Sequence, residues 1–159
     1  MMKRSMLALV VADQATRGFF PDALGSIESM TVPGFRDSAQ TIVGVRQAEA
    51  GDFAEARRTL LGGVDANGAP RFSSESHATL IGLLATAGRL DEAYAEAVMM
   101  TRRPADASLN EDVFEDVLIA FVKAGQASRA FDLAARLSKY DRGNSWYYLV
   151  IAEALGPAS

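Results

Sequence analysis

The sequence predicts an all-α solenoid of four antiparallel helical hairpins followed by a closing helix. A short glycine-containing motif recurs four times along the 159 residues, and apolar residues flank each copy at helical spacing. No segment shows the apolar–polar alternation that is typical of a half-buried strand. We therefore expect one domain over residues 1–159, with repeated units at about 4–33, 37–70, 73–104 and 109–140 and a closing helix at 144–155.

The recurring motif is a glycine followed five residues later by an alanine. The glycines are Gly18, Gly51, Gly88 and Gly125, which lie 33, 37 and 37 residues apart, and the alanines are Ala23, Ala56, Ala93 and Ala130. Glycine enters left-handed backbone space without a Cβ penalty, so it can end a helix. The small alanine then lets the next helix fold back closely against the first. Each copy of the motif predicts the turn of a helical hairpin.

The first two hairpins are placed around Gly18 and Gly51. We expect the first at residues 4–16 and 20–30, and the second at 38–50 and 52–62. Pro33 falls in the expected connection between them, where its missing N–H does no harm.

The last two hairpins are placed by apolar residues upstream of their glycines. These residues are Leu80, Ile81 and Leu84 in the third unit and Phe114, Val117, Leu118 and Phe121 in the fourth. They predict helices at 74–87, 89–101, 110–124 and 126–138, and an unpaired helix follows at about 145–155. Ser108 and Glu111 have the spacing of a capping box that opens the fourth unit.

The composition excludes several kinds of site. Cysteine is absent and histidine occurs once, which removes disulfides, thiol nucleophiles and multi-histidine metal centres. With 16 basic and 20 acidic residues, the net charge is −4, which disfavours nucleic acid and anionic membranes as partners. The one histidine, His77, lies on the apolar stripe of the third unit and is expected to pack in the core. We expect no catalytic residue, no metal site and no cofactor.

The N-terminal residues resemble a short export signal. Lys3 and Arg4 precede the apolar run from Met6 to Ala12, but that run is brief and Asp13 follows it directly. No other run approaches the length of a membrane span. We expect a cytoplasmic protein, with export as the alternative.

The repeated pattern resembles the tetratricopeptide-type helical repeat over essentially the whole chain. Trp146 and Phe114 occupy its early aromatic position, Gly44 its small mid-helix position, and the four glycines its turn. Phe20, Phe53 and Leu90 fill the position two residues after the turn. The sequence departs from the family where a tyrosine is usual late in the first helix, since Gln14, Gln47, Leu84 and Phe121 stand there, and its period exceeds 34 residues.

This resemblance implies a right-handed solenoid that works as a non-enzymatic scaffold and holds a peptide or partner helix in a concave groove. Family members that bind chaperone tails carry a clamp of lysine, asparagine and arginine. The matching positions here are Thr41, Val45, Thr79, Asp112 and Asp116, so a carboxylate tail would meet acids instead of bases.

A weaker resemblance to pentatricopeptide repeats rests on Ala78-Thr79-Leu80-Ile81 and Ala87-Gly88-Arg89-Leu90. It implies RNA binding through one polar side chain per unit. The corresponding residues are Ala8, Thr41, Ala78 and Glu115, of which only Thr41 could read a base edge. The groove also lacks the basic residues that RNA requires.

Two surfaces are candidates for binding. The repeat geometry implies a small, apolar groove wall that includes Val45, Gly82, Ile119, Val122 and Ile151. The closing helix is apolar nearly all round, although solenoids usually end in a polar face. If Trp146, Leu149 and Val150 pack inward, then Tyr147, Tyr148 and Ile151 face outward. We therefore expect self-association through Trp146, Tyr147, Tyr148 and Ile151, giving a possible homo-oligomer.

The function expected from the sequence is thus a protein–protein interaction scaffold. Three alternatives stay open: a fragment or small subunit of a larger repeat protein, an RNA-binding helical repeat, and an enzyme of unrecognised type. The identity of the partner is not encoded in any motif of the sequence.

Overall fold

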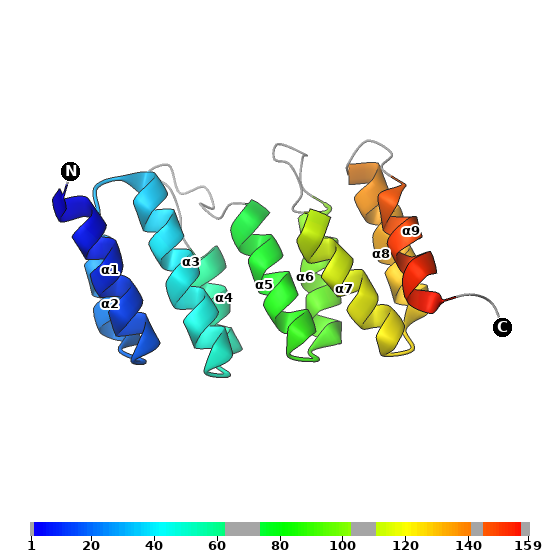
Figure 1. Ribbon diagram of the computed structural model, residues 1–159, viewed down its shortest axis with the longest axis horizontal. Coiled ribbons are helices and arrows are strands. Elements are labelled where there is room, and N and C mark those ends of the chain that lie inside the picture. Colours follow the sequence, from blue (N-terminus) through cyan, green and yellow to red (C-terminus); the bar gives the residue numbers. More distant parts are fainter. Residues whose placement is uncertain (1, 63–73, 103–110, 141–144, 157–159) are drawn as a thin grey trace. The chain divides into compact units, whose positions relative to one another are not determined.

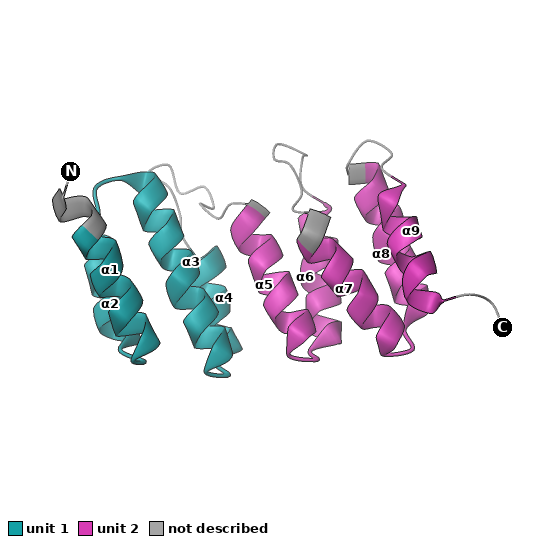
Figure 2. Cartoon of the chain, in the orientation of Figure 1, with its two compact units in different colours: residues 1–72 teal, residues 73–159 magenta. Residues whose placement is uncertain are grey.

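The computed structural model describes residues 2–62, 74–102, 111–140 and 145–156, and these residues form nine helices and no strand (Figure 1). The all-α prediction is confirmed for this part of the chain. The chain divides into two compact units, residues 1–72 and 73–159 (Figure 2). The expectation of a single domain concerns how these units sit together, and it stays a prediction.

Unit 1 consists of two hairpins whose first helices pack against each other. Its helices are α1 (Met2–Thr16), α2 (Phe20–Glu28), α3 (Pro33–Glu49) and α4 (Phe53–Leu61). α1 pairs with α2 and α3 pairs with α4, while α3 also contacts both helices of the first hairpin. Val11, Ile27 and Val43 belong to one buried cluster that joins the two hairpins. Each hairpin therefore covers an apolar face that its neighbour could not bury alone.

Unit 2 repeats this arrangement and adds a fifth helix. It contains α5 (Ser74–Thr86), α6 (Leu90–Met100), α7 (Glu111–Lys123), α8 (Ala127–Tyr140) and α9 (Trp146–Leu155). The first helices α5, α7 and α9 contact one another in that order and form one layer; α6 and α8 form the layer behind them (Figure 1). Apolar side chains of α5, α7 and α8 fill the space between the layers, among them Leu80, Phe114, Phe121 and Leu133, each almost completely buried.

The four predicted glycine turns have one backbone geometry. Gly18, Gly51, Gly88 and Gly125 have φ values of +80°, +88°, +74° and +73°. In the third hairpin the Gly88 N–H donates to the Ala85 carbonyl at 3.0 Å, and the Arg89 N–H donates to the Leu84 carbonyl at 2.9 Å. The same pair of bonds recurs at the other three turns, and together they satisfy carbonyls that the helix end would leave open.

The alanine five residues after each glycine has the predicted role. Ala23, Ala56, Ala93 and Ala130 are each 0% exposed. Each donates its backbone N–H to the residue just after the glycine, for example Ala93 to the Arg89 carbonyl at 3.0 Å. The motif therefore determines both the hairpin turn and the first hydrogen bond of the second helix.

The start of α3 differs from the prediction. The helix begins at Pro33 rather than near residue 38, because proline at the first helical position has a suitable φ and needs no N–H partner. The preceding helix ends at Glu28, where Arg36 Nη2 donates to the Met30 carbonyl at 2.6 Å and the Glu28 carbonyl at 3.3 Å. Arg36 thus ties the connection to the helix that follows it. The Ser108–Glu111 capping box lies outside the described residues.

In the second hairpin the large side chain at one helix contact comes from the second helix, and Gly44 stands opposite it on the first. A Cβ at this position would lie 2.5 Å from Leu60 Cγ, so the glycine makes room for that side chain. At the corresponding positions of the later hairpins the first helix carries the large residue, Ile81 or Leu118, and the second carries alanine, Ala97 or Ala134. All four of these residues are fully buried. The combined side-chain volume at this contact is thus similar in the three hairpins, but a different helix supplies the large residue.

Candidate protein-interaction surfaces

The predicted groove residues do not all lie on an accessible surface. Val45, in unit 1, is half-buried, as are Gly82, Ile119 and Val122 in unit 2. Ile151 is 0% exposed and packs inside unit 2, so the expectation that a partner touches it is wrong. Gly82 lines a pocket between α5 and α7.

This pocket, called the α5–α7 pocket below, has a volume of about 310 Å³. It is lined by one stripe from each of the two helices: Thr79, Gly82, Leu83, Ala85 and Thr86 from α5, and Val113, Asp116 and Ala120 from α7. The lining is mainly apolar, with two threonine side chains and one carboxylate. Its volume lies at the lower limit of ligand pockets, which suits one or two side chains of a partner better than a large cofactor.

Glycine at position 82 lets α5 and α7 approach each other closely beside the pocket. A Cβ built there would lie 3.3 Å from Val113 Cγ1, tighter than ordinary van der Waals contact. The corresponding positions in the other units carry Ala12, Val45 and Ile119, each with a side chain where Gly82 has none. Since glycine inside a helix costs about 1 kcal/mol relative to alanine, the close approach of Val113 to Gly82 is obtained at the expense of helix stability.

Asp116 gives the pocket its charge. Its side chain is exposed at the rim, and none of the ion pairs between described residues includes it. By sequence, α5 and α7 carry the acids Glu75, Glu111, Asp112, Glu115 and Asp116 and the single base Lys123. The second-helix layer is more balanced, because α8 contributes Arg129, Arg136 and Lys139. The layer that holds the pocket is therefore the more acidic one in unit 2.

The inward face of α9 is not the predicted one. Tyr147 and Ile151 are 0% exposed and Val150 is 3% exposed, so the expectation that Tyr147 and Ile151 face away from the fourth hairpin is wrong. α9 has two overlapping stripes that could pack inward, and the one that does continues to Ala154. The other continues from Trp146 to Glu153, seven residues later, and a carboxylate in the core would be costly. Glu153 was the signal in the sequence that separates the two stripes.

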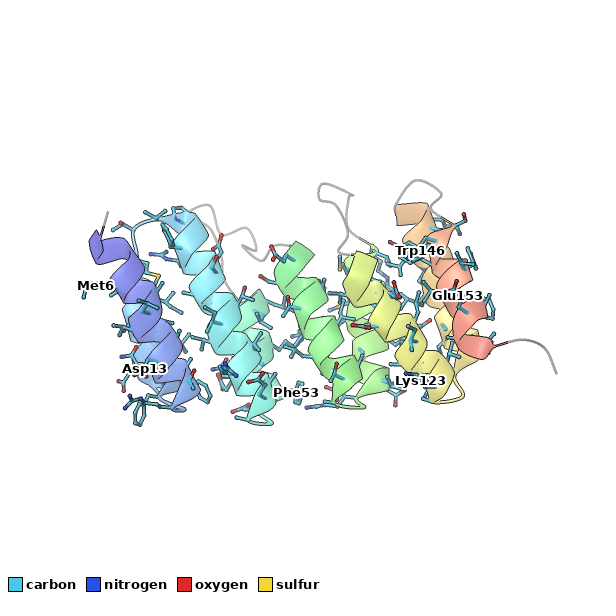
Figure 3. All side chains as sticks on the ribbon, in the orientation of Figure 1. Met6, Asp13, Phe53, Lys123, Trp146 and Glu153 are labelled. Carbon is cyan, nitrogen blue, oxygen red and sulfur yellow. The ribbon has the colours of Figure 1, made fainter. Side chains whose placement is uncertain are left out.

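The outward face of α9 still carries large apolar side chains. Trp146 is 40% exposed, Tyr148 39% and Leu149 48%. Trp146 and Glu153 both lie on this helix in Figure 3. Two of the four residues expected to mediate self-association, Trp146 and Tyr148, are thus accessible.

A polar cluster that the sequence reading missed joins the second helices α6 and α8. Arg129 pairs with Asp91, and its guanidinium carbon lies 5.5 Å from the centre of the Tyr94 ring. The Tyr94 hydroxyl donates to Asp132 Oδ2, which also accepts from Arg136 Nε at 2.7 Å. The interhelical pairs are 38 residues apart, close to the repeat period, and that spacing was the available signal.

These contacts shift the pKa values of the Asp132 carboxyl and the Tyr94 hydroxyl in opposite directions. The hydrogen bond from Arg136, followed by that from Tyr94, holds the pKa of Asp132 below its usual range. The hydrogen bond to Asp132, together with desolvation by burial, raises the pKa of the Tyr94 hydroxyl. The Asp132 carboxylate is thus kept ionised and binds the two helices together.

His77 is buried, as expected, and it has an acidic neighbour. Its Nε2 lies 2.9 Å from Glu96 Oε2 on the adjacent helix, with the two residues 1% and 7% exposed. Neither residue lines the α5–α7 pocket. This pair is placed to join α5 to α6 inside a hairpin.

Within the described residues, no group of three or more histidines, cysteines or acids is arranged to hold a metal ion. None of the helices in this part of the chain combines the length and the hydrophobicity that a membrane crossing needs. No protein-family model matches the chain, and no curated protein matches it in sequence.

Proposed function

We propose that the protein is a non-enzymatic interaction module that binds a segment of a partner protein at the α5–α7 pocket. In this proposal the four hairpins and α9 form a tetratricopeptide-like stack, and the first helices form its binding side. The observation that carries the proposal is the α5–α7 pocket, a mainly apolar depression on the first-helix layer.

The charge of this layer favours a protein partner over RNA. The rim residue is Asp116, and the sequence of α7 adds Glu111, Asp112 and Glu115. A nucleic-acid groove needs cationic side chains to neutralise phosphates, whereas these acids would repel them. A peptide that contains apolar residues meets no such penalty.

The buried titratable pair supports a structural role over a catalytic one. A general acid or base must reach the reacting proton directly or through one water. His77 and Glu96 are buried between α5 and α6 and lie outside the pocket lining. Their position suits the packing of a hairpin.

A face-specific photocrosslinking experiment tests the proposal. A photoreactive benzoylphenylalanine is placed at Thr86, on the pocket rim, and in a matched variant at Ala95, an exposed position on the second helix α6. After irradiation in the cells that make the protein, we expect a discrete protein adduct from the Thr86 variant and none of that size from the Ala95 variant. Equal adducts from both positions, or an adduct to RNA, would overturn the proposal.

A second candidate is self-association through the outward face of α9. Trp146, Tyr148 and Leu149 are 39–48% exposed and lie on one helix, and such residues are enriched at interface cores. Tyr148→Asp together with Leu149→Asp should convert a dimer to a monomer in analytical ultracentrifugation, with Glu28→Asp as a neutral control on unit 1. A monomer for the unmodified protein at high concentration would exclude this candidate.

A further inference from the structure

The α5–α7 pocket carries information about the kind of segment that enters it. Its lining is mainly apolar, and the exposed Asp116 supplies its one carboxylate. Because no ion pair between described residues includes Asp116, its charge is available to a ligand. A ligand that matched both features would place an apolar group inside and a cation at the edge.

We propose that the pocket binds a peptide segment in which a leucine-sized apolar residue is directly flanked by lysine or arginine. This inference rests on the proposed function and deepens it by naming the chemistry of the partner. The apolar side chain occupies the pocket lined by Gly82, Leu83 and Val113, and the cation pairs with the Asp116 carboxylate.

The volume supports a single anchor residue. About 310 Å³ accommodates a large aliphatic or aromatic side chain with part of its backbone, and burying such a side chain is the main source of affinity in peptide grooves. Thr79 and Thr86 flank the same opening with hydroxyl groups. Thr79 already donates to the Glu75 carbonyl at 2.9 Å, so its oxygen is placed to accept a hydrogen bond from the peptide.

The charge of the surrounding helix supports a cationic neighbour. α7 alone carries four acids in its first six residues and one base at its end. Acids in the first turn of a helix are favoured by the helix dipole, which accounts for part of this run. Asp116 lies beyond that turn and on the pocket rim, so the dipole does not explain it. An acidic peptide would be repelled here, and a neutral one would gain nothing from the rim.

Selection from a library of random twelve-residue peptides displayed on phage tests this inference with the full-length protein as bait. We expect the enriched peptides to share an apolar residue next to lysine or arginine. A synthetic peptide of the enriched sequence should shift the backbone amide resonances of Gly82 and Val113 in a ¹⁵N-correlated spectrum. Raising the salt concentration should weaken its binding.

Two variants and their matched controls separate the two features. Gly82→Val adds to the pocket lining the side chain that Val45 carries at the corresponding position, and should weaken binding at least tenfold. Gly25→Ala changes a helical glycine with nothing within 4 Å and should leave binding unchanged. Asp116→Asn should weaken binding about twofold to fivefold, as expected for an exposed ion pair, whereas Asp37→Asn makes the same charge change on unit 1 without effect.

The outcomes distinguish the inference from the proposed function. Enriched peptides that lack a cation, or that bind Asp116→Asn as tightly as the unmodified protein, overturn the choice of partner and leave the interaction module intact. Enrichment that is equal for the unmodified protein and Gly82→Val overturns the pocket as the site. No enrichment above an empty support overturns both. Circular dichroism of each variant confirms that a loss of binding does not reflect unfolding.

Discussion

The third and fourth hairpins share one backbone design but fill it with different chemistry. Both turn at a glycine with positive φ, and both make the same pair of turn hydrogen bonds. Between the helices of the third hairpin lies the buried pair His77–Glu96, with Nε2 and Oε2 2.9 Å apart. The corresponding residues of the fourth hairpin are Phe114 and Leu133, both 0% exposed. The backbone is thus set by the turn, while the interior accepts any complementary pair.

The largest expected effect comes from breaking the polar pair. Glu96→Leu leaves the His77 ring buried beside an apolar side chain, and loss of one partner of a buried pair typically costs about 3–5 kcal/mol. Urea unfolding of unit 2, followed by the fluorescence of Trp146, the one tryptophan of the chain, measures this cost. Glu92→Leu is the control, because Glu92 pairs with Arg89 on the surface and its loss should cost less than about 1 kcal/mol.

The double change His77→Phe with Glu96→Leu copies the fourth hairpin into the third. Replacing a buried pair by apolar residues of similar size is often neutral or stabilising, so most of the loss in the single variant should be recovered. A double variant that is as unstable as Glu96→Leu would show that the two hairpins are not interchangeable.

The next effect concerns the hairpin in which the large residue comes from the second helix. Gly44→Ile drives a side chain into Leu60, whose Cγ would lie 2.5 Å from even a Cβ, and overpacking of this kind costs about 1–3 kcal/mol. Adding Leu60→Ala reproduces the combination Ile81 and Ala97 and should restore stability. Thermal unfolding followed by circular dichroism measures both, and Gly25→Ala, which meets no neighbour, should raise stability by up to about 1 kcal/mol. If the double variant were less stable than Gly44→Ile alone, the large residue could not be moved from the second helix to the first in this hairpin.

The sequence predicted those features that depend on local backbone chemistry. Gly18 and its three counterparts were located because a left-handed turn residue is a local requirement. The start of α3 was missed because Pro33 is acceptable both in a connection and as the first residue of a helix. The inward face of α9 was missed because nearly all of its residues are apolar and periodicity alone does not choose a stripe.

The pocket was predicted only in its parts. Gly82 was expected in a groove, and Asp116 was recognised as an acid where a clamp would need a base. That the two line one depression depends on how α5 and α7 pack, which no local pattern specifies. The same holds for Tyr94 and Asp132, which are 38 residues apart and meet only when α6 and α8 come together.

A smaller effect on stability is expected where the second helices α6 and α8 contact each other. Tyr94→Phe removes the hydroxyl that donates to Asp132 but keeps the ring, which stacks edge-on with Phe121 at a centroid distance of 6.0 Å. One hydrogen bond of this kind contributes about 0.5–1.5 kcal/mol. Urea unfolding followed by Trp146 fluorescence should show a loss in that range, and Tyr148→Phe, on the outward face of α9, serves as the control with no loss. A loss as large as that of Glu96→Leu would place this contact in the core of unit 2 rather than at its surface.

The smallest effect is on the pH dependence of stability. The folded-state pKa of Asp132 is lowered from its ordinary value of 3.8, first by the hydrogen bond from Arg136 and then by that from Tyr94. A group whose pKa is lower when folded stabilises the protein above its unfolded pKa, and this contribution disappears as the pH falls through the folded pKa. Because the Asp132 side chain is 43% exposed, solvent screening limits the contribution to less than about 1 kcal/mol. Between pH 7 and pH 3, Asp132→Asn should therefore lose slightly less stability than the unmodified protein, and Asp37→Asn should follow the unmodified curve. If Asp132→Asn instead loses more stability on acidification than the unmodified protein, folding raises the pKa of Asp132 rather than lowering it. The α6–α8 contact would then depend on the pair Arg129 and Asp91.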